Sequence, residues 1–369
     1  MGIERYRREI DKIDRDMLDL FLRRMQAAKE IGVYKKEKGL PVYDARREAD
    51  VLDSRVGSVG EEHLRQSARD FFVSLMELSK AYQKRIVLQD ALPLRREAEG
   101  VVAFQGVEGA FSEEALFSYF APDVQTLAQG SFEDVLRAVG EGRAQYGVLP
   151  AENSATGVIA EVYDLLTAGD CVIVGERMLR VRHCLLALPG VEMGEIRTVC
   201  SHPQGLLQCQ DFIRKHGFLQ RSMENTALSA QQVAQMGDRS LGAIASCRAA
   251  QVYGLEVLRS DISRSGNTTR FIVIGATQTA DSRADKVSVA FTLRHESGAL
   301  YRALSCFYEE GLNLLKIESR HGEGNWEYRF YVDFEGNLDE ERVQRAFAGI
   351  QRTCTRFKLL GNYRMDPNV

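Results

Sequence analysis

The stretch Asn267-Thr268-Thr269-Arg270-Phe271 combines an amide, two hydroxyls, a cation and an aromatic ring. It runs directly into Phe271-Ile272-Val273-Ile274, an apolar run that predicts a buried strand. The polar side chains therefore lie at the leading end of a strand, where we expect them to face a cleft. The alternative is a plain turn, because Asn and Thr are common in turns. Other motifs along the chain decide between the two.

The composition predicts a folded protein of more than one domain. At 369 residues the chain exceeds one ordinary domain, so we expect two or three. Its 44% hydrophobic and 27% charged residues are typical of soluble globular proteins. No apolar run has the length of a membrane span, and the polar N-terminus does not resemble a signal peptide, so we expect a cytoplasmic protein with no membrane partner. The net charge of −4 argues against general nucleic-acid binding, and an anionic substrate would require a locally basic pocket.

Seven cysteines are scattered along the chain, at positions 171, 184, 200, 209, 247, 306 and 354. No two form a Cys-x-x-Cys pair, and none has a His partner at zinc spacing. We therefore expect buried thiols in a reducing compartment and no metal site.

Residues 1–90 predict an all-helical domain. Apolar residues recur at a spacing of three and four, which predicts one amphipathic helix from Ile3 to Lys38, ended by Gly39-Leu40-Pro41. Further helices are expected over 44–55 and 61–89. The first helix would be roughly 54 Å long. One small domain cannot cover that length, so we expect a second copy of the chain to pack against it.

Polar side chains interrupt the apolar faces of these helices. Arg24 shares a face with Ala28 and Ile31, and Ser79 and Gln83 interrupt the stripe of the third helix. A buried cation without a partner costs several kcal/mol, so Arg24 requires an anion. That anion is either a carboxylate in a structural salt bridge or a small ligand held inside the helical bundle.

This segment resembles the all-helical chorismate mutase domain. The resemblance implies that four cations bind the substrate carboxylates, and that Lys35, Glu48 and Gln83 are catalytic because they stabilise negative charge on the ether oxygen. Asp44 as a helix N-cap and Arg47 as a solvated charge are the plain structural alternatives. The residues that match the family are Arg7, Arg24, Lys35, Asp44, Arg47, Glu48, Ser79 and Gln83.

The spacing of two of these cations implies a homodimer. Arg7 and Lys35 lie roughly 42 Å apart along one helix, so they cannot touch one small molecule within a single protomer. If both bind chorismate, Arg7 must reach into the partner's site. The rearrangement is unimolecular, so the site has only to hold the dianion in its reactive conformation and stabilise the growing charge. Glu48 donates a hydrogen bond only when protonated, so burial beside the substrate should raise its pKa.

Residues 101–278, which follow a short charged linker at 91–100, predict a two-lobed α/β domain. Apolar runs alternate with amphipathic stretches, an order typical of this class, and we expect a cleft between the lobes. The predicted strands are 101–104, 146–149, 172–174, 184–188 and 241–245, and the predicted helices are 113–120, 132–139, 204–215 and 227–236.

Polar turns cluster at the ends of these strands. Residues 106–112 form a glycine-rich turn, with Ser112 as the expected N-cap of the next helix, and such a turn can present backbone N–H groups to a carboxylate. Taken singly, each turn is also explained as a loop or a helix cap. The other turns are Pro150-Ala151-Glu152-Asn153-Ser154, Ser201-His202-Pro203-Gln204 and Glu224-Asn225-Thr226-Ala227.

Together with Thr269-Arg270-Phe271, these motifs resemble the prephenate dehydratase family in order and spacing. The resemblance implies that Thr269 is the catalytic residue on which dehydration depends most. It also implies that no cofactor is needed, because formation of an aromatic ring supplies the driving force. His202 is a further candidate general acid because of its pKa range, ranked below Thr269. The implied substrate contacts are Glu152, Asn153, Ser201, His202, Gln204, Thr268, Thr269, Arg270 and Phe271.

Residues 286–369 predict a small α+β domain. Strands at 287–293, 314–319, 326–332 and 357–360 and helices at 299–310 and 339–349 give the ferredoxin-like order βαββαβ. This order resembles the ACT domain, an amino-acid sensor, and implies that L-phenylalanine binds as an effector. His321 stands where the family usually has Pro, which puts the shape of that turn in question. The alternative is a structural domain that only dimerises. The implied effector contacts are Gly298, Ala299, Leu300, Asn313, Leu314, Glu318, Ser319 and Arg320.

The three resemblances together imply a bifunctional enzyme of phenylalanine biosynthesis. It would convert chorismate to prephenate and then prephenate to phenylpyruvate, inhibited by L-phenylalanine, as a homodimer or a tetramer. One alternative is a dehydratase that prefers arogenate. Another is a non-catalytic regulator that senses a ligand through its ACT domain. The regulator does not explain the Thr-Arg-Phe stretch, and no basic stripe for nucleic acid is visible.

Overall fold

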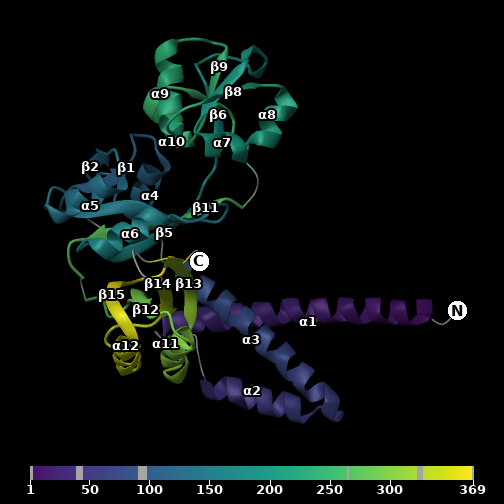
Figure 1. Cartoon of the computed structure of the whole chain (residues 1–369). Coiled ribbons are helices and arrows are strands. Elements are labelled where there is room, and N and C mark those ends of the chain that lie inside the picture. The colour runs from purple at the N-terminus through teal and green to yellow at the C-terminus, as the bar shows by residue number, and fades with distance from the viewer. Residues whose placement is uncertain are drawn as a thin grey trace. The chain divides into compact units, whose positions relative to one another are not determined.

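The computed structural model describes residues 3–38, 45–89, 98–263, 266–278, 280–321 and 327–367. The chain divides into two compact units, Met1–Leu94 and Arg95–Pro367 (Figure 1). Asp44, the side chain of Glu48 and most of the expected linker lie outside the described residues. Among the residues described, no helix is both long and apolar enough to span a membrane, and no cluster of side chains has the composition of a metal site.

The N-terminal unit consists of α1 (Ile3–Glu37), α2 (Ala45–Gly57) and α3 (Glu62–Gln89), with bounds within two residues of those predicted. Figure 1 shows α1 as one long helix. Ala28 on α1 and Met76 on α3 are buried where these helices pack together. Towards the N-terminus of α1, however, Ile3 and Ile10 are 64% and 56% exposed. The apolar face of α1 therefore remains largely uncovered within this unit.

The larger unit contains a mixed ten-stranded sheet of strand order β13-β14-β12-β15-β5-β11-β3-β1-β2, with β4 beside β3. β11 lies antiparallel between β3 and β5, so the strand predicted at 271–274 is central; it begins earlier than predicted, at Thr268. The elements of this first lobe are β1 (Val102–Gln105), α4 (Phe111–Tyr119), β2 (Thr126–Gln129), α5 (Phe132–Gly140), β3 (Tyr146–Asn153), β4 (Gly157–Val158), α6 (Ala160–Ala168), β5 (Val172–Arg180) and β11 (Thr268–Gly275).

A second lobe is built on a five-stranded sheet of order β10-β6-β9-β7-β8. The chain enters this lobe after β5 and leaves it before β11, so two passages join the lobes (Figure 1). The single helix predicted over 204–215 is two helices, because Cys209 closes the first and opens the second. The elements are β6 (Cys184–Ala187), the 3-10 turn at Met193–Glu195, β7 (Thr198–Ser201), α7 (Pro203–Gln208), α8 (Gln210–His216), β8 (Leu219–Ser222), α9 (Thr226–Met236), β9 (Leu241–Ala245), α10 (Cys247–Tyr253) and β10 (Glu256–Arg259).

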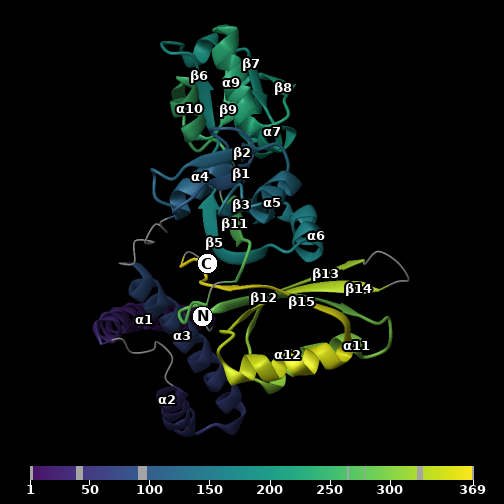
Figure 2. The same cartoon turned by 90° about the vertical axis from the view of Figure 1, so that its left-hand side faces the viewer.

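The C-terminal part of the larger unit has the predicted order of strand, helix, strand, strand, helix, strand. Its four strands lie in the order β13-β14-β12-β15, and α11 and α12 pack on them around one apolar core (Figure 2). β15 also pairs in parallel with β5, at Gly361 and Ile173, which joins these strands to the first lobe. The elements are β12 (Lys286–Leu293), α11 (Ala299–Glu309), β13 (Leu314–His321), β14 (Tyr328–Glu335), α12 (Glu341–Thr353) and β15 (Cys354–Tyr363).

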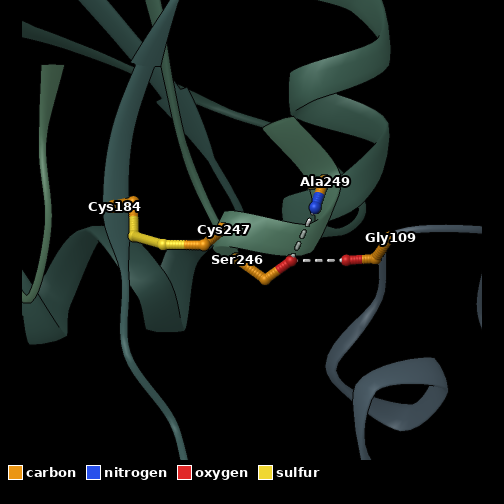
Figure 3. The surroundings of a disulfide bond; sticks show 5 residues. All are labelled: Gly109, Cys184, Ser246, Cys247 and Ala249. Carbon is orange, nitrogen blue, oxygen red and sulfur yellow. Dashed lines mark hydrogen bonds between the residues drawn. A yellow bond between two sulfur atoms is a disulfide. The ribbon is translucent and has the colours of Figure 1, made fainter. Parts of the chain in front are cut away.

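The cysteine prediction is wrong for one pair. Cys184 and Cys247 form a disulfide with 6.1 Å between their Cα atoms. Figure 3 shows that Ser246, next to this bond, donates a hydrogen bond to the carbonyl of Gly109 and accepts one from the N–H of Ala249. The disulfide thus ties β6 to the start of α10, where α10 meets the glycine-rich turn of the first lobe. The free cysteines among the described residues are Cys171, Cys200, Cys209, Cys306 and Cys354.

The join between β15 and β5 requires a glycine at 361. A Cβ at this position would collide with the carbonyl oxygen of Ile173. We therefore expect Gly361→Ala to lower the free energy of unfolding by about 1–3 kcal/mol, the usual cost of overpacking. The urea midpoint measures this change, and Gly140→Ala is the control because a Cβ at Gly140 would meet open space. Equal midpoints for the two variants would contradict the requirement.

Candidate functional site

A cavity of about 300 Å³ lies between the two lobes of the larger unit, and both lobes line it. Its lining side chains are apolar or uncharged and polar, apart from two histidines, and none of these lining residues is Lys, Arg, Asp or Glu. A second hollow of about 530 Å³ beside β8 and α9 has Glu224 as the one ionisable residue of its described lining. The cavity between the lobes therefore has the denser set of polar groups, and it contains the start of β11.

Strand β11 divides its polar residues between two faces of the sheet. Side chains alternate along a strand, so Thr269 and Phe271 line the cavity whereas Arg270 points to the opposite face. The neighbouring strand β3 divides in the same way, because Asn153 pairs with Thr269 and Glu152 pairs with Arg270. One face of this strand pair therefore borders a neutral cavity, and the other face holds charged groups.

A chain of side-chain amides orients the hydroxyl of Thr269. Nδ2 of Asn153 donates to Oγ1 of Thr269 at 2.8 Å and to Oδ1 of Asn267 at 2.7 Å. Nδ2 of Asn267 in turn donates to Oε1 of Gln208 at 2.9 Å. Because Thr269 accepts the hydrogen bond from Asn153, its own hydroxyl hydrogen is left to donate to a molecule in the cavity.

His183 extends this chain into the cavity wall. Its Nε2 lies 2.9 Å from Oε1 of Gln208, and because that amide oxygen can only accept, Nε2 carries the hydrogen. Nδ1 then presents a lone pair, and no described residue partners it. The ring is 3% exposed, and this burial lowers the pKa of His183. The hydrogen bond that His183 donates to Gln208 acts in the opposite direction but is the smaller effect. The imidazole is therefore neutral at neutral pH.

Helix ends supply the positive potential of this cavity, in place of the basic side chains expected for an anion. Ala110, His202 and Asn225 are the N-caps of α4, α7 and α9, and all three line the cavity. A helix N-terminus attracts anions through its free N–H groups and its dipole. His202 and Asn225 each accept one N–H of their own helix, whereas no side chain caps α4. Ser112 is not the N-cap predicted, because α4 begins at Phe111.

The glycine-rich turn before α4 is held in place by α10. Gly109 has a φ of 85° in the left-handed region, and a Cβ there would lie 2.9 Å from Cα of Ala249. Arg248 of α10 pairs with Glu113 of α4 at 2.6 Å. Glu113 also accepts the N–H of Gly109 at 2.8 Å. That N–H is therefore used within the turn, and only the start of α4 remains to bind a ligand carboxylate.

Arg270 is the centre of a charged cluster on the opposite face of the sheet. Its Nε lies 2.7 Å from Oε2 of Glu176, and its Nη1 lies 2.7 Å from Oδ2 of Asp333. Nη1 also pairs with Glu152, and Nη2 donates to Tyr363 at 2.7 Å. Arg270 is only 5% exposed, and a buried charge is tolerated only when it is paired and hydrogen-bonded. These four partners meet that condition.

Two lysines complete the cluster. Lys286 lies 2.9 Å from Glu176, and Lys316 lies 2.8 Å from Glu152. Burial alone would raise the pKa of Asp333, but Arg270 and the lysines hold it below its ordinary value. Burial alone would also raise the pKa of Glu152, but Arg270 and Lys316 hold it below its ordinary value. Asp333 and Glu152 are therefore ionised at neutral pH, and the cluster pairs three carboxyl groups with three cations.

The structure brings together some of the implied substrate contacts of this domain and separates others. Those that line the cavity are Asn153, His202, Gln204, Thr269 and Phe271. The expectation that Glu152, Arg270 and Thr268 line it is not met, because alternation along β3 and β11 turns them away. Ser201 does not line it either, since it is fully buried and donates to the carbonyl of Ile244 at 2.6 Å.

Sequence reasoning missed three residues of this cavity. Asn267 belongs to the stretch that was singled out, but no role was assigned to it. Gln208 and His183 have no signal in the sequence, because they reach Asn267 only through the packing of the second lobe against the first.

In the N-terminal unit, Arg24, Ser79 and Gln83 meet where α1 packs on α3. Arg24 donates to the carbonyl of Leu75 at 3.0 Å and contacts Oγ of Ser79. Ser79 and Gln83 are buried, at 6% and 9% exposure. Burial lowers the pKa of Arg24. Among the described residues no carboxylate pairs with Arg24, so the structural salt bridge considered from the sequence is not observed there.

The other cations of this unit lie away from Arg24 or on the surface. Arg7 is exposed and pairs with Glu4 at 2.9 Å near the start of α1, roughly 25 Å along the helix from Arg24. Lys35 is partly buried near the end of α1, and Arg47 is exposed on α2. Arg7 and Lys35 therefore lie at opposite ends of one straight helix, as the spacing predicts.

The implied effector contacts lie at two places in the C-terminal part. Gly298, with a φ of 77°, is the N-cap of α11, and it is followed by Ala299 and Leu300. Asn313 precedes the edge strand β13, which carries the remaining contacts. The exposed side of β13 includes Leu315 and Ile317. On the other side Arg320 pairs with Asp164 of α6 at 3.1 Å.

Two family models match the chain in the regions described above. The chorismate mutase type II model matches residues 6–84, and the prephenate dehydratase model matches residues 102–279. A bifunctional chorismate mutase/prephenate dehydratase from Aquifex aeolicus is 32% identical over 98% of this chain and 97% of its own length. An arogenate dehydratase/prephenate dehydratase from Arabidopsis thaliana is 35% identical over 82% of this chain and 84% of its own.

Solved structures resemble the larger unit. A prephenate dehydratase from Arthrobacter aurescens in complex with L-Phe is 30% identical, with a TM-score of 0.66, covering 72% of this chain and 90% of that one. GqqA, described as a novel type of quorum quenching acylase, is 32% identical, with a TM-score of 0.68, covering 73% of this chain and 99% of that one.

The lowered pKa of Asp333 predicts how acid affects stability. A carboxyl group whose pKa is lower in the folded state stabilises the fold above its ordinary pKa, and that contribution is lost as the pH falls through the folded value. We expect Asp333→Asn to lose about 3 kcal/mol of unfolding free energy at neutral pH, because Arg270 loses a buried partner. Below about pH 4 the variant should lose less further stability than the wild type does.

Urea unfolding at pH 7, 5 and 3 measures this difference. The control is Glu141→Gln, because Glu141 pairs with Arg143 at the surface, where an ion pair contributes little. Parallel pH profiles for the wild type and Asp333→Asn would show that Asp333 does not contribute through its charge.

Proposed function

This chain belongs to the family of bifunctional chorismate mutase/prephenate dehydratases, and we propose that the cavity at Thr269 is its dehydratase site and the α1–α3 face around Arg24 its mutase site. The protein rearranges chorismate to prephenate, then removes carbon dioxide and water from prephenate to give phenylpyruvate. The observation that carries the dehydratase assignment is the hydrogen bond from Asn153 to Thr269, which leaves the Thr269 hydroxyl hydrogen available to the cavity.

Dehydration of prephenate requires help mainly for the departing hydroxyl. The bond between the ring and its carboxylate breaks, the electron pair enters the ring, and the ring–oxygen bond breaks on the other side. The leaving oxygen needs a proton or a strong hydrogen bond, and Thr269 is the donor that the geometry aims at it. A threonine hydroxyl is too weak an acid to give up its proton outright, so Thr269 acts as an aimed donor or as the last link from a stronger acid.

The uncharged lining of the cavity suits the loss of carbon dioxide. A Lys or Arg beside the departing carboxylate would stabilise its charge in the bound substrate more than in the transition state, where that charge moves into the ring. Such uniform or ground-state binding does not accelerate the reaction. The second carboxylate keeps its charge throughout, and the uncapped start of α4 offers N–H groups to hold it.

We expect Thr269→Ala to lower the dehydratase kcat by about 10²–10³, the usual effect of removing one aimed donor. The mutase activity of the same protein should remain, because its proposed site lies in the other compact unit, and the urea midpoint of the larger unit checks the folding around Thr269. Thr268→Ala is the matched control, because its hydroxyl does not line the cavity. The measurement is phenylpyruvate formation from prephenate, and equal losses for both Thr variants would contradict the assignment.

The mutase assignment is supported by the burial of Arg24, Ser79 and Gln83 without a described carboxylate partner for Arg24. A chorismate carboxylate would supply the missing anion. Gln83, with Lys35, is suited to donate hydrogen bonds to the ether oxygen as negative charge grows there. Glu48 and Asp44 keep the roles that the resemblance implies for them. Asp44 and the side chain of Glu48 lie outside the described residues.

A homodimer would complete this site. The exposed apolar residues of α1 offer a surface for a second copy, as the length of the helix predicts. Arg7 and Lys35 cannot reach one ligand within a protomer, so the partner's Arg7 must supply the missing cation. Pairing of dimers into tetramers is compatible with the same chain.

Complementation between two inactive variants tests this arrangement. Arg7→Ala and Arg24→Met should each abolish mutase activity, because each removes a cation from both sites of the homodimer. After the two variants exchange subunits, half of the dimers are mixed, and each mixed dimer has one intact site. We expect about a quarter of wild-type mutase activity to return.

The control mixes Arg24→Met with Gln83→Leu. Both of these residues lie on the same protomer's side of a site, so no mixed dimer contains an intact one, and activity should stay absent. If the Arg7 and Arg24 variants exchange subunits without regaining activity, Arg7 does not act in the partner's site.

We propose that the C-terminal part is a ferredoxin-like ACT domain that binds L-phenylalanine and inhibits the enzyme. The order of its elements and the exposed side of the edge strand β13 support this proposal, as does the complex of the Arthrobacter aurescens relative with L-Phe. The proposed contacts are Gly298, Ala299, Leu300, Asn313, Leu314, Glu318, Ser319 and Arg320. His321, in place of the usual Pro, would affect the affinity for the effector rather than its identity.

A second candidate substrate for the same cavity is arogenate. The relative from Arabidopsis thaliana is named as both an arogenate dehydratase and a prephenate dehydratase. Arogenate has the same ring and leaving groups as prephenate but an amino group in place of the keto oxygen, and it would yield phenylalanine directly. Comparing kcat/KM for the two substrates decides between them.

An acylase activity of the kind named for GqqA is checked by assaying release of an acyl chain, and the Thr269→Ala variant shows whether it uses this cavity.

A further inference from the structure

The charged cluster around Arg270 is neutral only as a whole. Glu152, Glu176 and Arg270 come from the α/β part of the chain and together carry a net charge of −1. Lys286, Lys316 and Asp333 come from the C-terminal part and carry +1. Neither set of residues could be buried alone without an unbalanced charge, which is costly in a protein interior. The C-terminal part is therefore needed to neutralise the α/β part.

This cluster lies directly behind the dehydratase cavity. Glu152 immediately precedes Asn153, and Arg270 immediately follows Thr269, while the two pairs face each other across β3 and β11. A shift of either charged side chain therefore moves the backbone that carries Asn153 and Thr269. Their hydrogen bond of 2.8 Å is short, so a displacement of about 1 Å would break it.

Lys316 differs from the other members of the cluster in its place in the fold. It is the one member on β13, the edge strand of the sheet. Its Nζ lies 2.8 Å from Oε1 of Glu152 and 2.7 Å from the hydroxyl of Tyr163, with the side chain 12% exposed. Its neighbours Leu315 and Ile317 point to the exposed side of the strand. Lys316 thus connects a strand at the edge of the sheet to the residue beside Asn153.

We propose that Lys316 is a positioning residue of the dehydratase: by pairing with Glu152 behind the sheet, it holds Asn153 and Thr269 in their productive arrangement. The same pair links the catalytic residues to β13, so a ligand that displaces β13 would reach the active site through Lys316. This second consequence rests on the proposed effector role of β13, whereas the positioning role does not.

Substitution of Lys316 by Met, which keeps the length of the side chain, removes its charge. In the full-length protein we expect Lys316→Met to lower the dehydratase kcat about tenfold, with little change in KM, because binding groups in the cavity remain but the donor is misaligned. Lys316→Arg keeps the cation and should restore most of the activity. The urea midpoint of the larger unit, compared with that of the wild type, shows whether this unit is folded, which mutase activity of the separate N-terminal unit would not report.

Lys358→Met is the matched control. Lys358 also lies in the C-terminal part and donates to backbone carbonyls at the end of α6, among them that of Thr167 at 3.2 Å. It therefore contacts the α/β part without entering the cluster. Its substitution should leave the dehydratase kcat nearly unchanged, and a loss equal to that of Lys316→Met would overturn the proposal.

A double-mutant cycle tests whether Lys316 acts through Glu152. Glu152→Gln combined with Lys316→Met removes one charge of each sign, so the cluster stays neutral and the fold is protected even if the single variants unfold. If the pair acts as one unit, the double variant should lose no more activity than the more impaired single variant. Losses that multiply, or an unchanged kcat in a folded Lys316→Met protein, would overturn the proposal.

Inhibition by L-phenylalanine provides the last readout. The remaining activity of Lys316→Met should require an effector concentration at least several-fold higher for half inhibition than that of Lys358→Met. In Lys358→Met the pair between Lys316 and Glu152 is intact. If the wild type itself is not inhibited, the proposed effector role fails, and the kcat comparisons still decide whether Lys316 positions the site. If Lys316→Met is inhibited as fully as the wild type, the link through Lys316 is excluded.

Discussion

The buried guanidinium of Arg270 is the constraint on which the larger unit depends. A cation that is 5% exposed must be paired, and its carboxylate partners come from β3, β5 and β14. Because those strands belong to segments far apart in the sequence, the α/β part and the C-terminal part have to meet before the charge is satisfied. The cluster that results pairs charges of both signs, and it lies behind the strand pair that carries Thr269 and Asn153.

On the front of the same strands, the chemistry is arranged without charged side chains. The cavity combines amides, hydroxyls, two imidazoles and the ends of three helices, so it can bind an anion by N–H groups instead of ion pairs. This arrangement suits a reaction in which one carboxylate must lose its charge to leave. The charged side chains thus lie on one face of the strand pair β3 and β11, and the uncharged donors line the cavity on the other face.

The N-terminal unit solves a different problem with much less burial. Its described helices bury few apolar side chains within the unit, and Arg24, which is partly buried, has carbonyl and hydroxyl partners but no described carboxylate. Within this unit the apolar face of α1 therefore stays largely exposed, whereas the larger unit has cores of its own.

The sequence by itself determined the three N-terminal helices, the order of strands and helices in the C-terminal part, and the family motifs, because local periodicity and turn chemistry are written in neighbouring residues. Between residues 101 and 278 it missed several short elements whose local pattern is weak: β2, β4, β7, β8, β10, α6 and α10. The sequence did not show that only Thr269, and not Arg270, lines the cavity. Both residues belong to one motif, and only the pleat of β11 places their side chains on opposite faces of the sheet. Nor did the sequence reveal His183, Gln208, the Cys184–Cys247 disulfide or the partners of Arg270. Those pairings join residues distant in the chain, so only the tertiary structure, which must satisfy every buried charge and donor, decided them.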